Sequence, residues 1–203
     1  MSSAKKIVSN CGIVVLAAGA STRLGKPKQL LPYQGKSLLQ HVVDAAVNSK
    51  ANPVIVVLGA NADLVSTEID KIKVHVIENS EWEEGMASSI RTGLNTLLKI
   101  SPVVDAVIFM VCDQPFVSAA VLDDLITTYM KTGKPIVTCN YGEAIGSPTL
   151  FHKSLFAELM QLKGDAGARK IIQTHNDEVA TVLFVKGNID IDTKEDYEAS
   201  KNL

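Results

Sequence analysis

Short apolar runs alternate along this chain with longer stretches in which apolar residues return every three or four positions. The short runs are rich in Val, Ile and Leu, and most of them end in small or polar residues. This pattern is typical of buried strands in a parallel sheet. It predicts strands at residues 13–16, 53–58, 74–77, 106–112 and 135–139.

Two stretches between these strands have the spacing of amphipathic helices. Apolar residues fall at i, i+1, i+4, i+5 and i+8 in residues 38–46, and again in residues 121–129. Ser118 is the predicted N-cap of the second helix, and Thr193 with Asp196 resembles a capping box for a last helix. The alternation predicts an α/β fold with a mostly parallel sheet covered on both faces and ligands at the carboxyl ends of its strands.

Composition fits one domain spanning residues 1–203 and a small-molecule function. The chain is 46% hydrophobic and 5% aromatic, with a net charge of −2, so we expect no nucleic-acid partner. Apolar runs are shorter than the roughly 18 residues that span a bilayer, so we expect no membrane partner and a cytoplasmic location. The three cysteines form no CxxC pair and are predicted core residues.

A loop of small residues followed by cations comes directly after the first predicted strand. Residues 17–20 read Ala-Ala-Gly-Ala, and Arg23, Lys26 and Lys28 follow. Small residues let the backbone approach an anion, and the cations can pair with phosphate oxygens, so this segment is a candidate triphosphate site. The alternative is a turn that merely packs a helix on the sheet, since the segment is neither GxxxxGK[ST] nor GxGxxG.

Carboxylates mark two further junctions. Asp113 follows the strand at residues 106–112 and precedes Pro115, and Asp190 and Asp192 lie two residues apart in a predicted extended segment. Acids from separate strands, together with a basic loop, suit a complex of Mg²⁺ with a nucleotide. Two alternatives remain: Asp113 is a simple cap of its loop, or one of the two later acids only supports the turn.

The motifs together resemble those of the molybdenum cofactor nucleotidyltransferases, most closely the CTP:molybdopterin cytidylyltransferase type. They are LAAGxSxRLGxxKxLLP at residues 16–32, CDQP at 112–115, GSP at 146–148 and DIDTxEDY at 190–197. The resemblance implies a Rossmann-like, GT-A-like nucleotidyltransferase fold, a three-layer sandwich. It also implies Mg²⁺-dependent transfer of CMP from CTP to the phosphate of molybdopterin, with release of pyrophosphate.

The resemblance also assigns roles by position. The base, ribose and phosphates would contact the loop Leu16, Ala17, Ala18 and Gly19, with closure by Asn79, Gly85 and Ser89. The triphosphate would be clamped by Arg23 and Lys28, which with Asp113 are the candidate catalytic residues. The metal would be held by Asp113 and Asp192, and the acceptor by Gly146, Ser147, Pro148 and Arg169. Family members often carry His where this chain has Ser147.

Several alternatives stay open at the level of sequence. Ala18 favours CTP because guanylyltransferases have Gly there, but a transferase that uses GTP or another phosphate acceptor also fits. So does a molybdenum cofactor carrier that delivers its cargo to a molybdoenzyme. Arg169 is either an acceptor ligand or an exposed helical residue behind an Asp165 N-cap, and Trp82 either stacks on a ring or packs under its loop.

Overall fold

The computed structural model describes residues 10–200, apart from the side chain of Arg23. Seven strands form one sheet in the order β5-β4-β1-β6-β8-β7-β9. All neighbours pair in parallel except β8, which is antiparallel to β6 and β7. The strands are β1 (Cys11–Ala17), β4 (Val54–Leu58), β5 (His75–Glu78), β6 (Ala106–Val111), β7 (Ile136–Asn140), β8 (Ile145–His152) and β9 (Val179–Leu183); β2 (Pro32–Tyr33) and β3 (Lys36–Ser37) form a separate ribbon.

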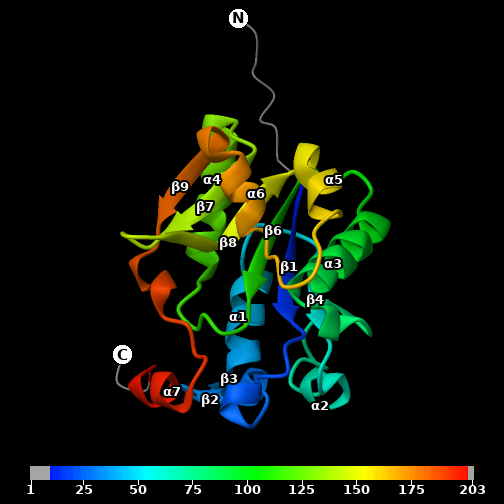
Figure 1. The fold of residues 1–203 in the computed structure, drawn as a ribbon, viewed down its shortest axis with the longest axis vertical. Helices are drawn as coiled ribbons and strands as arrows, with labels where there is room; N and C mark the ends of the chain where they lie inside the picture. Colours follow the sequence, from blue (N-terminus) through cyan, green and yellow to red (C-terminus); the bar gives the residue numbers. More distant parts are fainter. Residues whose placement is uncertain (1–9, 201–203) are drawn as a thin grey trace, which may run out of the picture.

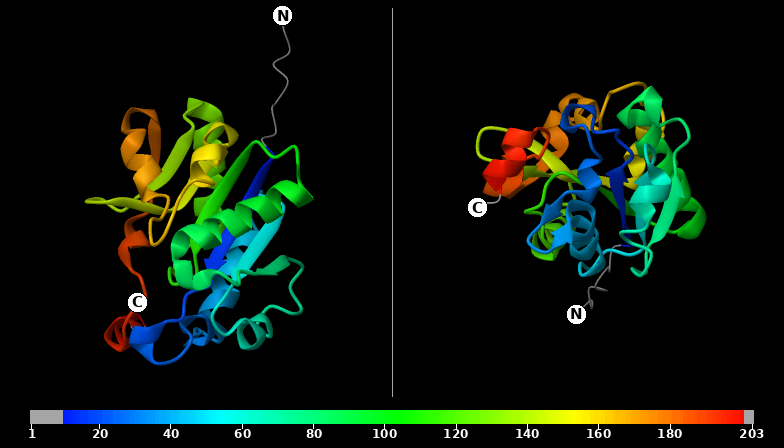
Figure 2. Two further views of the ribbon diagram at one scale, coloured as in Figure 1. Left: turned by 45° about the vertical axis from the view of Figure 1, so that its right-hand side comes forward. Right: turned by 90° about the horizontal axis from the view of Figure 1, so that it is seen from below.

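Helices cover both faces of the sheet, which gives the predicted three layers (Figures 1 and 2). The helices are α1 (Leu38–Val47), α2 (Ala62–Ser66), α3 (Met86–Ile100), α4 (Ala119–Thr132), α5 (Phe156–Leu159), α6 (Arg169–Thr174) and α7 (Lys194–Ser200). Single 3-10 turns occupy Thr22–Leu24, Lys28–Leu30, Trp82–Glu84, Lys153–Leu155, Asn176–Glu178 and Val185–Asn188. No helix within residues 10–200 is both long and apolar enough to span a membrane.

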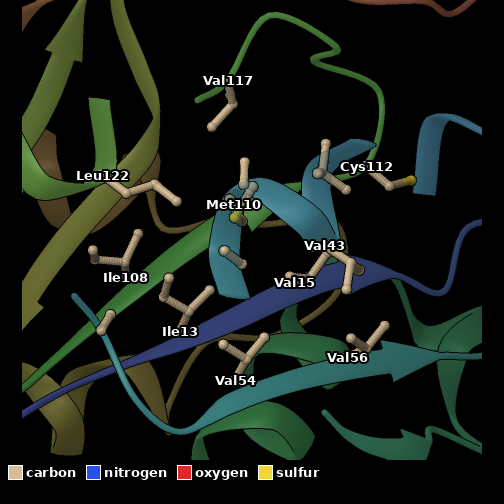
Figure 3. Close-up of a cluster of buried hydrophobic side chains, with 14 of the residues drawn as sticks. Ile13, Val15, Val43, Val54, Val56, Ile108, Met110, Cys112, Val117 and Leu122 are labelled. Carbon is tan, nitrogen blue, oxygen red and sulfur yellow. The ribbon is translucent and has the colours of Figure 1, made fainter. Parts of the chain in front are cut away.

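Alternate residues of the central strands fill two separate cores. Ile13 and Val15 of β1 pack with α1 and α4 on one face, as the close-up of buried side chains shows (Figure 3). Val14 of the same strand packs with α3, α5 and α6 on the other face. Burying one such side chain contributes about 1.5–3 kcal/mol, so a strand that is apolar on both faces is held from both sides. Cys11, Cys112 and Cys139 are buried and unpaired, as predicted.

The five predicted strands and both predicted helices are confirmed. Most of the observed strand ends differ from the predicted ends by one or two residues. Ser118 caps α4 by accepting a hydrogen bond from the Val121 amide, and the Thr193–Asp196 box opens α7. The interpretation of Asp165 as an N-cap is wrong, because α6 begins at Arg169 and Ala168 precedes it without a side-chain cap.

The sheet brings the candidate site together at one edge. Parallel β1, β4, β5 and β6 end at the same edge, toward which the arrow of β1 points at the lower side of Figure 1. The chain returns to that edge after β9, where the Ile191 amide donates to the Asp113 carbonyl at 3.0 Å. This backbone bond places the segment around Asp192 beside the exit of β6.

Gly93 lets α3 approach the sheet closely. A Cβ built on this residue would collide with Val14 of β1 and lie 3.0 Å from a methyl carbon of Val57. We predict that Gly93→Val lowers the free energy of unfolding by about 1–3 kcal/mol, the usual cost of overpacking a core. Asn95→Val on the exposed side of α3 is the matched control. Urea unfolding checks this, and equal stability of the two variants would contradict the packing described.

Candidate active site

The loop of small residues after β1 is held open by a buried glutamine that the sequence analysis missed. The Gln29 side chain is fully buried, and its amide nitrogen donates to the carbonyls of Ala17 at 2.7 Å and Gly19 at 2.9 Å. The Lys28 amide donates to the Ser21 hydroxyl at 3.0 Å. These bonds fix the two halves of residues 17–29 against each other, so that Lys28 points back toward the end of β1.

Lys28 joins two acids that are far apart in sequence. Its ammonium forms ion pairs with Asp113 Oδ2 and, at 3.1 Å, with Asp192 Oδ1. The Lys28 and Asp113 side chains are only 17% and 14% exposed, so solvent screens this pair weakly. Burial lowers the pKa of Lys28, but the charge of Asp113 and hydrogen bonds to both acids outweigh it, so its pKa lies above the ordinary value. Lys28 is therefore cationic at neutral pH.

Asp192 is positioned by the turn that opens α7. The amides of Asp192 and Thr193 donate to Asp196 Oδ2 at 3.2 and 2.8 Å. Asp190 lines a neighbouring cavity, where desolvation and the charge of Asp113 raise its pKa. Of the two later acids, Asp192 is the one that shares the ammonium of Lys28 with Asp113.

The donor set fits a divalent cation that is also bound by phosphates. Asp113 Oδ1 is buried and has no hydrogen-bond partner among the described residues, and the Lys28 ammonium stands as a cation between the two carboxylates. Within the described part of the chain, no group of three His, Cys, Asp or Glu side chains could hold a metal ion. Asp113 and Asp192 are therefore the carboxylates here that could hold a divalent cation together with phosphate oxygens.

Two cavities meet at Asp113. The first, which we call the loop cavity, has a volume of about 460 Å³ and lies between the loop after β1 and the start of α3. The second, which we call the strand cavity, has a volume of about 390 Å³ and lies beside β6, β8 and α6. Leu16, Met86, Val111 and Asp113 line both cavities.

Most of the predicted nucleotide residues line the loop cavity. They are Leu16, Ala18, Gly19, Lys28, Gly85 and Ser89. Ala17 and Asn79 instead lie beneath it: Ala17 accepts the bond from Gln29, and the Asn79 amide donates to the hydroxyls of Ser88 and Ser89 at 2.8 and 3.0 Å. Trp82 lies in the wall of the loop cavity.

The strand cavity combines an apolar wall with a few polar groups. Phe109, Phe151 and Ile172 supply apolar surface, and the predicted acceptor residues Gly146, Ser147 and Arg169 also line it. Pro148 is buried in β8 and does not line it. Gln114 and Tyr141 also belong to this wall, and the sequence analysis did not single them out. Tyr141 lies outside all of the sequence motifs, whereas Gly146 and Ser147 belong to GSP.

Two hydrogen-bonded side chains shape the strand cavity. The Gln114 amide nitrogen donates to the Gly187 carbonyl at 2.9 Å and to the Tyr141 hydroxyl at 3.3 Å, and that hydroxyl donates to the Ser147 carbonyl. Burial raises the pKa of Tyr141 to about 12, so its phenol stays protonated.

Burial and the charge of Asp113 raise the pKa of Cys112 to about 12, which makes this thiol a poor nucleophile. The side chain of Arg23 lies outside the described part of the structure.

Comparison with known proteins identifies relatives along most of the chain. The chain is 30% identical to nicotine blue oxidoreductase of Paenarthrobacter nicotinovorans, over 79% of this chain and 80% of that protein. It is 27% identical to purine catabolism protein PucB of Bacillus subtilis, over 91% and 93% of the two chains.

A solved structure has the same fold. Rv0371c from Mycobacterium tuberculosis superposes with a TM-score of 0.81 at 30% identity, covering 96% of this chain and 99% of that one. A manganese complex of the same protein superposes with a TM-score of 0.80 at 28% identity, with the same coverage. A family model described as the MobA-like NTP transferase domain matches residues 13–179. Because that match takes in most of the 203 residues, this chain belongs to the MobA-like NTP transferase family and is a nucleotidyltransferase.

Proposed function

We propose that this nucleotidyltransferase moves CMP from CTP to a phosphate of a molybdopterin-type acceptor, with Mg²⁺ and with release of pyrophosphate. The supporting observation is the ion-paired cluster of Lys28, Asp113 and Asp192, in which Asp113 lines both cavities and Lys28 lines the loop cavity. In this proposal the loop cavity takes the nucleotide and the strand cavity takes the acceptor. The α-phosphorus then lies near Asp113, which lines both.

The reaction needs alignment and charge neutralisation more than a strong base. An oxygen of the acceptor phosphate is already anionic near pH 7; it attacks the α-phosphorus, and the bond from that phosphorus to the bridging oxygen of the pyrophosphate breaks. No proton has to be removed for this step. Lys28, and Arg23 from the same loop, are proposed to offset the charge of the two polyanions and of the departing pyrophosphate.

Asp113 and Asp192 are the proposed metal ligands. A bound divalent cation would neutralise phosphate charge and hold the triphosphate in line for attack. Manganese in the complex of Rv0371c is consistent with a divalent ion in this fold. If such an ion binds, the Lys28 ammonium must leave the two carboxylates. The phosphates of the bound nucleotide would then be the nearest anions with which it can pair.

Pyrophosphate release tests the proposed function. Purified protein is incubated with Mg²⁺ and each of the four nucleoside triphosphates, with and without molybdopterin, and Asp113→Asn is the inactive control. Release from CTP that depends on molybdopterin is the expected result. Preference for GTP would place the protein among the guanylyltransferases, and nucleotide or cofactor binding without release would indicate a carrier or a different acceptor. A parallel assay for a redox change of nicotine blue tests the activity named for the relative from Paenarthrobacter.

Loss of either partner of the buried ion pair is predicted to slow the chemical step. Lys28→Ala and Asp113→Ala should each reduce kcat by at least about 100-fold, as expected when one preorganised electrostatic group is removed. Lys36→Ala is the matched control, because Lys36 is an exposed lysine paired with Asp44 at 2.5 Å. Near-normal turnover in both site variants would contradict the assignments.

Lys28 and a metal ion are predicted to compete for the same two carboxylates. Lys28→Met should therefore tighten binding of Mn²⁺ to the nucleotide-free protein by roughly tenfold, a magnitude usual for coupled sites. Electron paramagnetic resonance of free Mn²⁺ measures this without any turnover, with Lys36→Met as the control. Unchanged affinity would show that the carboxylates holding Lys28 are not the metal site.

Ala18 is the proposed determinant of base choice. It is buried at the loop cavity, and its Cβ lies 2.8 Å from a Cβ built on Gly59, so the wall here is tightly packed. We predict that Ala18→Gly widens the pocket and shifts the ratio of kcat/KM for CTP over GTP toward GTP by about 10-fold, within the range that one methyl group supplies. An unchanged ratio would show that Ala18 does not determine base choice.

A further inference from the structure

The segment formed by residues 162–169, which we call the strap, lies between the two cavities. It runs from α5 to α6 past the start of α3, as the yellow loop in Figures 1 and 2 shows. Asp165 lines the loop cavity, whereas Gly167, Ala168 and Arg169 line the strand cavity. Any shift of the strap therefore changes the shape of both cavities.

Two charged side chains outside the catalytic cluster fasten the strap to α3. Arg91 of α3 binds Glu84 in a fork, with Nη1 to Oε1 at 3.0 Å and Nη2 to Oε2 at 2.5 Å. Arg91 Nη1 also donates to the Leu162 carbonyl at 2.6 Å. The Gly164 amide in turn donates to Glu84 Oε1 at 3.4 Å. Each member of the pair thus holds both its partner and the strap backbone.

The backbone of the strap is also in direct contact with the start of α3. The Ala87 amide donates to the Gly164 carbonyl at 3.0 Å. Gly85 has a φ of +113°, and a Cβ there would meet the carbonyl carbon of Gly164 at 2.6 Å, so the strap packs where a side chain would stand. Gly85, Met86 and Ser89 are themselves in the wall of the loop cavity. The nucleotide wall and the strap therefore form one connected unit.

Charge and partial burial make this fork specific for arginine. The Arg91 side chain is 21% exposed, and its hydrogen bonds to Glu84 raise its pKa while lowering that of Glu84. A lysine keeps the positive charge but has a single nitrogen, so it cannot reach both carboxylate oxygens and the Leu162 carbonyl in the fork geometry. The position of the strap depends on that geometry and not on charge alone.

We infer that Glu84 and Arg91 are positioning residues that couple the two cavities. Nucleotide bound in the loop cavity then orders the strap, and the ordered strap completes the acceptor wall of the strand cavity. This inference rests on the proposed function. Contacts with the nucleotide fix the positions of Gly85 and Met86. The fork and the hydrogen bond of the Ala87 amide then fix Gly164, so that residues 167–169 are held against the strand cavity. Without the fork, nucleotide still binds but no longer orders the acceptor side. The acceptor KM then rises while the nucleotide dissociation constant changes little.

Hydrogen exchange of a peptide covering residues 162–169 tests this without an acceptor. It is measured with and without Mg²⁺ and a non-hydrolysable CTP analogue, whose affinity is determined separately by calorimetry. In the native protein the analogue should slow exchange at least about fivefold, a typical coupling. Arg91→Lys and Glu84→Gln should exchange faster in the free protein and lose most of the slowing while still binding the analogue. Lys153→Gln, which breaks the exposed pair with Asp105, is the matched control.

A charge swap separates positioning from simple stabilisation. The double variant Glu84→Arg with Arg91→Glu restores an ion pair, but it leaves the Leu162 carbonyl without its donor and the Gly164 amide without its acceptor. It should recover much of the melting temperature and none of the nucleotide-dependent protection. Full protection in the swap or in Arg91→Lys would overturn the inference, as would absence of nucleotide-dependent slowing in native protein that binds the analogue. If native protein binds no nucleotide, the proposed function fails. Even then, an unchanged exchange rate of residues 162–169 in nucleotide-free Arg91→Lys would show that the ion pair of Glu84 with Arg91 does not hold the strap.

Discussion

The ion pair of Lys28 with Asp113 and Asp192 is the interaction on which the site depends. It joins a loop that follows β1, the exit of β6 and the turn before α7, three segments that are brought together only by the tertiary fold. Breaking a pair this deeply placed leaves an uncompensated charge near the sheet. Asp113 lines both cavities, so this member of the cluster has access to the contents of both, which a group-transfer reaction requires.

The sheet explains why these segments meet. Parallel strands end at a common edge, and the loop after β1 and Asp113 after β6 emerge there as neighbours because the two strands are paired in register from Cys11 and Ala106 onward. The antiparallel β8 then borders β6 and provides the wall of the strand cavity. Catalytic groups are thus supplied by strand exits, and the wall opposite is supplied by β8 and the strap.

Local patterns in the sequence predicted the central strands, the caps of α4 and α7, the fold class and the family, because each of these depends on consecutive residues or on motifs. Strand β8 was missed because its first half contains Gly, Ser and Pro, and β9 because it is a short, half-exposed edge strand. Gln29 and Arg91 were missed for another reason. Gln29 binds backbone carbonyls of the loop after β1, and a residue type does not reveal a bond to a backbone carbonyl. Arg91 binds the carbonyl of Leu162, 71 residues away, and no spacing rule connects positions that far apart.

A crystal structure with Mn²⁺ and a non-hydrolysable CTP analogue would show directly whether the two carboxylates hold the metal and Lys28 holds the triphosphate. We expect an anomalous manganese peak between Asp113 and Asp192, the triphosphate in the loop cavity, and the Lys28 ammonium moved from the carboxylates to phosphate oxygens. Manganese and nucleotide bound elsewhere, with Lys28 still bridging Asp113 and Asp192, would contradict this expectation.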